Sequence, residues 1–195
     1  VQPDATSENF DALLVCAPDY PRVTPLPEGV VQCAERFLAA GKAVYVEYAP
    51  TFGLLEETPR TAGFERLLVI GEGRAVEGLE ARSILEEHTS RYLPLTPAGE
   101  ESLKGDSGQI LLSYGRAAGV DRTVFGLPKE TWPALVEIRR GGGRLLLAAT
   151  ALSNCARGRY KPTCAWATLL RSILLALLPE AKGEVVKRAF IDAEA

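Results

Sequence analysis

Long apolar runs alternate along this chain with stretches in which apolar residues recur at helical spacing. A continuous apolar run is typical of a strand buried on both faces of a parallel sheet, and helical spacing is typical of the helices that cover such a sheet. The segment 30–38 has this helical spacing, and Gly41 follows it as a stop signal. The pattern predicts five main strands, at residues 11–17, 43–48, 66–70, 109–114 and 145–150. We therefore expect an α/β fold with a mostly parallel sheet.

The second half of the chain carries the signal of an antiparallel hairpin. Apolar segments at 134–140 and 144–150 flank three consecutive glycines, which favour a tight turn between two strands. An antiparallel hairpin is therefore expected beside the parallel core. The pattern also predicts a helix over 76–88, a long loop over 95–107, a short strand over 123–127, a helix over 163–178 and, over 185–191, an edge strand or a connection to a neighbouring domain.

Composition favours one folded domain. The chain has 195 residues, 47% of them hydrophobic, which is enough to bury a sizeable core and too apolar for a disordered chain. Neither an internal repeat nor a low-complexity tract divides it, so residues 1–195 are interpreted as a single domain. Because the sequence begins at Val1 and contains no Met, we expect that domain to be part of a larger protein or a trimmed product.

Charge and hydropathy argue against two classes of partner. The formal net charge is -3, whereas proteins that bind nucleic acids usually carry a basic excess, so no nucleic-acid partner is expected. The longest apolar segment, residues 165–178, is interrupted by Arg171 and is too short to span a bilayer. We interpret this segment as a buried helix of a soluble protein.

Metal and nucleotide sites lack their usual motifs. The four cysteines, Cys16, Cys33, Cys155 and Cys164, form no C-x-x-C pair, and His88 is the single histidine, so no zinc site is expected. Neither G-x-G-x-x-G nor the P-loop pattern occurs, and no cofactor is predicted. Cys155 and Cys164 flank a loop that a disulfide could close, and the sequence leaves that pairing open.

Two residues are candidates for catalysis, and each has a structural alternative. Glu72 lies between two glycines after a predicted strand, where hydrolases and amidotransferases place a nucleophile on a tight turn. Its alternative is an exposed glutamate on a glycine turn. His88 is the one side chain of a type that normally titrates near neutrality, and its alternative is a capping role at a helix end. No partner residues complete a triad, so no catalytic residue is assigned.

A polar loop follows the apolar strand at 145–150 and precedes the last predicted helix. Within it, Asn154, Arg157, Arg159 and Tyr160 gather two guanidinium groups, an amide and an aromatic ring. Loops at the carboxyl ends of strands are where α/β sheets place binding groups, and arginine binds carboxylates and phosphates with paired hydrogen bonds. The four residues are therefore a candidate site for a small polar or anionic ligand. In the structural alternative, the arginines hold the loop through backbone carbonyls and nearby acids.

Three motifs together resemble a known family. They are GRAAGVDRTVFGLP at residues 115–128, the glycine hairpin at 141–143 and TALSNCARGRYKPTCAW at 150–166. They resemble the class I glutamine amidotransferase-like domain of large bacterial proteins linked to carbohydrate breakdown, which also occurs as the trimerisation domain of some β-galactosidases. The resemblance implies a flavodoxin-like three-layer sandwich. Amidotransferases of the family use a cysteine at the tight turn and a downstream His-x-Glu. This chain has Glu72 at that turn and no histidine after His88, so their chemistry is not expected here.

The resemblance favours a non-catalytic accessory or interaction domain associated with a carbohydrate-active enzyme. Its expected partner is an adjacent domain or subunit of a larger carbohydrate-active protein, with a homo-oligomer as a further expectation. Its localisation would be secreted or periplasmic if it is attached to a glycosidase. Two alternatives stay open: a hydrolase with an atypical active site around Glu72 and His88, and a small-ligand-binding module that uses the loop after Thr150.

Overall fold

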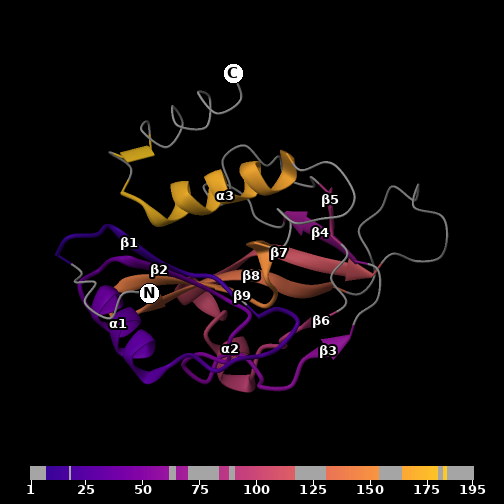
Figure 1. The fold of residues 1–195 in the computed structure, drawn as a ribbon, viewed down its shortest axis with the longest axis horizontal. Coiled ribbons are helices and arrows are strands. Elements are labelled where there is room, and N and C mark those ends of the chain that lie inside the picture. The colour runs from indigo at the N-terminus through magenta and orange to yellow at the C-terminus, as the bar shows by residue number, and fades with distance from the viewer. Residues whose placement is uncertain are drawn as a thin grey trace.

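The computed structural model of the chain describes residues 8–17, 19–61, 65–69, 84–87, 91–116, 131–153, 164–179 and 182–183. Within them the elements are β1 (Ala12–Val15), α1 (Glu28–Ala39), β2 (Ala43–Glu47), β3 (Arg60–Thr61), β4 (Glu65–Val69), β5 (Ile84–Glu87), β6 (Arg91–Tyr92), α2 (Pro97–Glu101), a 3-10 turn (Gly105–Ser107), β7 (Gly108–Arg116), β8 (Thr131–Arg140), β9 (Gly143–Ala148) and α3 (Cys164–Leu177). The main sheet lies between α3 on one face and α1 and α2 on the other (Figure 1). The predicted α/β class and its layered sandwich are confirmed.

The main sheet combines a parallel part and an antiparallel part. Its described strands follow the order β1-β2-β9-β8-β7-β4-β5. β1, β2 and β9 are parallel, and each pairing from β9 onward to β5 is antiparallel. The predicted hairpin is confirmed as β8 and β9, with Gly141 and Gly142 at φ values of 58° and 87° in its turn. The antiparallel part extends beyond this hairpin to β7, β4 and β5. The sequence did not predict this extension, because an apolar run indicates that a strand is buried but does not indicate its direction.

Alternate residues of β2 show how the layers are built. Val44 and Val46 belong to a buried cluster with Phe37 of α1. Ala43 and Tyr45 belong to a second cluster, which includes residues of α3. Strand geometry sends successive side chains to opposite faces, so one apolar run supplies the core on both sides of the sheet. The continuous apolar character of this strand is therefore explained by the helices on its two faces.

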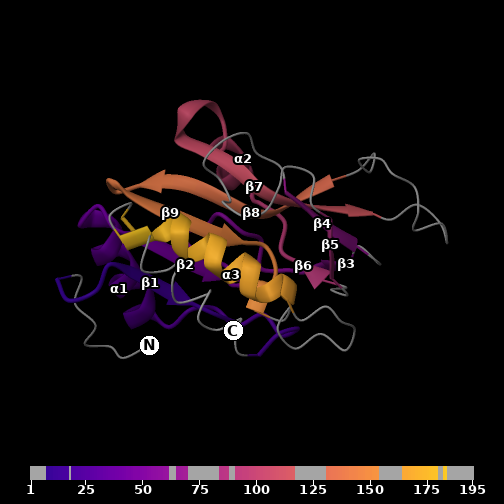
Figure 2. The same ribbon diagram turned by 90° about the horizontal axis from the view of Figure 1, so that it is seen from above.

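The predicted C-terminal helix is confirmed as α3, which lies over β2 and β9 (Figure 2). Its residues Ile173 and Leu177 are buried in the cluster that contains Leu146 of β9, whereas Leu170 and Leu174 are only partly buried. Burying one aliphatic side chain contributes about 1.5–3 kcal/mol, so these contacts stabilise the helix on the sheet. Among the described residues, no helix is long and apolar enough to cross a bilayer.

One predicted helix is replaced by a strand where the structure describes it. Residues 84–87 were expected at the end of a helix, but they form β5, which pairs antiparallel with β4 and places Ile84 opposite Leu68. The hydrogen-bonding edge of β4 offers these residues backbone partners, and a β-branched side chain such as Ile84 favours a strand. The rest of that helix and the predicted strands at 123–127 and 185–191 lie outside the described residues.

The predicted loop at 95–107 contains the short helix α2. The hydroxyl oxygen of Thr96 accepts a hydrogen bond from the backbone N–H of Gly99 at 3.1 Å, and Pro97 is the first helical residue. Threonine at the cap and proline in the first turn are typical of helix starts. Packing also requires glycine at position 99, because a Cβ atom there would lie 2.4 Å from the backbone oxygen of Leu54. The Thr-Pro pair was the sequence signal for this helix.

Candidate functional site

The carboxyl ends of β1, β2 and β9 meet at one edge of the sheet, which is where α/β folds place functional groups. Glu47 is the last residue of β2 and is only 1% exposed. Because it follows Tyr45 by two positions, its side chain lies on the same face of the sheet, the face that α3 covers. A carboxylate at such a position requires hydrogen-bond donors from the surrounding protein.

Among the described residues, four donors surround the Glu47 carboxylate. Oε1 accepts hydrogen bonds from the backbone N–H of Ala17 at 2.9 Å and from the Ser153 hydroxyl. Oε2 accepts from the Tyr45 hydroxyl at 2.6 Å and from the backbone N–H of Ser153 at 3.1 Å. Ala17 follows β1, and Ser153 follows β9, so one side chain joins the ends of three parallel strands. We call Glu47 with these three partners the Glu47 clamp.

Cys16 lies beside the Glu47 clamp, immediately before Ala17. Partial burial of the thiol, together with the negative charge of Glu47, raises the pKa of Cys16 to about 11. A thiol with that pKa is almost entirely protonated at neutral pH, and the thiolate is the form that attacks carbon centres. The environment of Cys16 therefore disfavours nucleophilic catalysis, although the residue itself is exposed.

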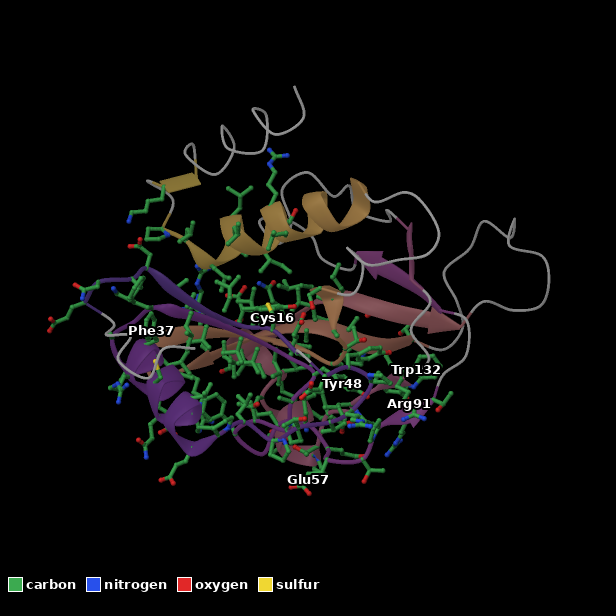
Figure 3. The ribbon with its side chains drawn as sticks, in the orientation of Figure 1. Cys16, Phe37, Tyr48, Glu57, Arg91 and Trp132 are labelled. Atoms are coloured by element: carbon green, nitrogen blue, oxygen red, sulfur yellow. The ribbon has the colours of Figure 1, made fainter. Side chains whose placement is uncertain are left out.

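The chain turns sharply at Tyr48, directly after Glu47. Tyr48 has a φ of 49°, in the left-handed region that side chains other than glycine rarely adopt. Its backbone N–H donates to the carbonyl of Ala148 at 2.9 Å, and its ring makes an edge contact with Tyr20 at 4.8 Å. Burial is the main cause that raises the pKa of Tyr48 to about 12. The Tyr48 side chain is packed in the core, on the other side of the sheet edge from Cys16 (Figure 3).

The residues that the sequence singled out are not among those described. Asn154, Arg157, Arg159 and Tyr160 lie outside the described residues, and so do Glu72, His88 and Cys155. The described chain nevertheless reaches Ser153, the residue directly before Asn154, and Ser153 is bound to Glu47. The predicted loop therefore starts at the carboxyl edge of the parallel strands, as expected. Its role as a ligand site stays a prediction.

Sequence reasoning missed the Glu47 clamp. The one available signal was a glutamate at the end of the apolar run AVYVEY, with the same strand parity as Tyr45. The donors come from distant segments, since Ala17 is 30 positions and Ser153 is 106 positions away from Glu47. The described residues contain no group of three or more His, Cys, Asp or Glu side chains arranged to hold a metal ion.

No family model and no curated protein matches the sequence. Solved structures of similar fold do exist. A cold-adapted β-galactosidase from Rahnella sp. R3 aligns with a TM-score of 0.54 and 14% identity, over 92% of this chain and 24% of that chain. A β-galactosidase from Bacillus circulans sp. alkalophilus aligns with a TM-score of 0.50 and 11% identity, over 88% of this chain and 23% of that chain. This chain thus spans about a quarter of either enzyme. The likeness concerns the fold, and it is consistent with the glutamine amidotransferase-like sandwich that the motifs imply.

Proposed function

We propose that residues 1–195 form a single non-catalytic accessory or interaction domain of a larger carbohydrate-active protein. Its partner would be an adjacent domain, another subunit or a second copy of the same chain. Two observations support this proposal. The sequence motifs resemble an accessory domain of carbohydrate-active proteins, and a domain of this fold makes up about a quarter of two solved β-galactosidases.

The Glu47 clamp is the observation that carries the non-catalytic part of the proposal. Amide hydrolysis in this fold needs a thiolate with a base beside it. At the described edge, the carboxylate of Glu47 already accepts four hydrogen bonds from the chain's own strand ends. Among the described residues, the thiol beside it is that of Cys16, whose pKa is raised to about 11. The carboxylate is therefore committed to holding the strand ends together, and the protonated thiol is poorly suited to nucleophilic attack.

A second candidate function is small-ligand binding by the loop after Thr150. The favouring observation is the anchoring of Ser153 to Glu47, which places the start of this loop at the carboxyl edge. Such an edge is the usual binding position in α/β sheets. Asn154, Arg157, Arg159 and Tyr160 would then contact a small polar or anionic ligand.

The accessory role is tested with the complete reading frame that encodes this domain, expressed with and without residues 1–195. We expect the flanking region to contain a carbohydrate-active catalytic domain. Deletion should lower its oligomeric state or melting temperature while changing its kcat per active site little. Light scattering, calorimetry and glycoside hydrolysis measure the three quantities. A reading frame without any carbohydrate-active domain would refute the proposal.

The isolated chain provides the complementary test of the non-catalytic role. It should release no ammonia from glutamine and hydrolyse no nitrophenyl glycoside or acetate ester above a buffer blank. Turnover that disappears in both Cys16→Ala and Glu47→Gln would show instead that the strand edge is an active site. Turnover that survives both substitutions and purification on a second column would place the activity elsewhere in the chain.

A further inference from the structure

A groove of about 420 Å³ lies between the small β3–β6 sheet, α2 and parts of β7 and β8. A volume of this size falls within the range of small-molecule sites in proteins. Figure 3 shows Trp132 and Arg91 at this end of the molecule, far from Phe37 of α1. The lining residues that bear on recognition are Glu56, Arg60, Tyr92, Glu100, Trp132 and Pro133.

An aromatic pair forms one part of the groove lining. The rings of Tyr92 and Trp132 lie 5.7 Å apart between centroids and are tilted by 41°. Both residues stand on paired strands, because Tyr92 pairs with Arg60 across β3 and β6, and Trp132 pairs with Tyr114 across β8 and β7. The rings are therefore held on a fixed backbone. Tyr92 is only 4% exposed and belongs to the core, whereas Trp132 is half-buried. Trp132, supported from behind by Tyr92, is therefore the ring that can offer a stacking surface to a weakly polar ring face.

Charged groups line the same groove. Nη2 of Arg60 donates to both carboxylate oxygens of Glu56 at 3.2 Å. The side chains stay accessible, at 59% exposed for Arg60 and 34% for Glu56. Glu100 of α2 adds a second carboxylate. Two carboxylates against one guanidinium leave a net negative charge, which disfavours an anionic ligand, while the groups still accept and donate hydrogen bonds.

We propose that this groove binds a neutral pyranose unit of a saccharide. A pyranose has an apolar C–H face and a rim of hydroxyl groups, and the groove offers the half-buried Trp132 ring beside two carboxylates and a guanidinium that solvent reaches. Pro94, Pro97 and Pro133 restrict the lining backbone, so little conformational entropy is lost on binding. The choice of a saccharide over other hydroxylated rings rests on the proposed carbohydrate association.

Binding is measured by NMR on the isotopically labelled chain, following the indole N–H of Trp132. The neutral probes are methyl β-D-galactopyranoside and methyl β-D-glucopyranoside. The charged probe is methyl β-D-glucuronide. We expect saturable chemical-shift changes of this N–H with at least one neutral glycoside. The glucuronide should bind more weakly by about tenfold or more, because its carboxylate is repelled by the carboxylates of the groove and cannot form the same hydrogen bonds with them.

Matched glutamate variants identify the site. Glu56→Gln and Glu100→Gln should each weaken binding of the neutral glycoside by about tenfold. Glu57→Gln and Glu101→Gln are the controls, because these neighbours are exposed and do not line the groove, and Glu57 projects outward at the rim of the molecule (Figure 3). Both controls should bind as the unchanged chain does. All four side chains lie at the surface, so folding is not expected to suffer.

Three results would overturn the saccharide proposal. The first is the absence of a saturable shift with either neutral glycoside. The second is tighter binding of the glucuronide than of the neutral probes. The third is an equal loss of affinity in the groove variants and their controls. None of these results bears on the accessory role, which the deletion of residues 1–195 from the complete reading frame tests by oligomeric state and melting temperature.

Discussion

The parallel strands β1, β2 and β9 end around a carboxylate that solvent hardly reaches, whereas the antiparallel strands β7 and β8 border a groove whose charged groups are open to solvent. Glu47 is 1% exposed and accepts four hydrogen bonds from its own chain. Glu56 is 34% exposed and forms an ion pair with Arg60. A buried charge must be satisfied by the fold, so its role becomes structural. An exposed charge keeps hydrogen-bonding capacity that a ligand can use.

The largest effect is expected from Glu47→Ala. The substitution leaves the backbone N–H groups of Ala17 and Ser153 buried or half-buried without their acceptor, and each such group costs about 1–3 kcal/mol. The hydroxyl groups of Tyr45 and Ser153 lose the same acceptor. Together, these losses should lower the free energy of unfolding, measured in urea, by about 4 kcal/mol. Glu57→Ala is the control and should change it by less than about 0.5 kcal/mol. A loss below about 1 kcal/mol in Glu47→Ala would mean that water replaces the carboxylate easily.

A smaller effect is expected from Tyr48 in alkaline solution. The folded protein raises the pKa of Tyr48 from 10.0 to about 12. Below pH 10 the phenol is protonated in both states and stability is unaffected, but between pH 10 and 12 only the unfolded state ionises, so stability falls. Relative to Tyr48→Phe, the unchanged chain should lose on the order of 1–2 kcal/mol by pH 12. Urea denaturation at pH 9, 10, 11 and 12 measures this. Parallel pH profiles for the two proteins would contradict the burial argument.

Much of the fold was predictable because it depends on short-range patterns. The apolar runs at β1, β2, β7 and β9, the glycine turn at 141–143 and the helical spacing of α1 each reflect interactions within a few residues of one another. The direction of β4 and β7 was not predictable in this way, since it depends on which edge the strand joins. The Glu47 clamp depends on contacts across 30 and 106 positions, which periodicity does not reveal. The loop from Asn154 to Tyr160 stays a prediction.

The reactivity of the Cys16 thiol is a third test of the sheet edge at which β1, β2 and β9 end. The pKa of Cys16 rises from 9.0 to about 11, which reduces the thiolate fraction at pH 7 by about 100-fold. The higher nucleophilicity of a more basic thiolate offsets part of this loss, so alkylation should be about tenfold slower than for a free thiol. Iodoacetamide labelling, followed by mass spectrometry of the peptide that contains Cys16, measures the rate. The rate should keep increasing up to about pH 11. A plateau near pH 7 would indicate an activated thiol and a catalytic edge.

The smallest effect is expected at the groove, for the Glu56–Arg60 ion pair. Exposed pairs typically contribute about 0–1 kcal/mol, because water and salt screen the charges and two long side chains lose conformational freedom. A double-mutant cycle with Glu56→Gln and Arg60→Gln should therefore give a coupling energy below about 0.5 kcal/mol in urea denaturation. The exposed pair of Glu101 and Lys104, at 2.6 Å, is the control and should give a similarly small value. A coupling energy above about 1.5 kcal/mol for Glu56 and Arg60 would show that the pair stabilises the fold. The groove would then resemble the Glu47 clamp, with its charges committed to structure rather than to a ligand.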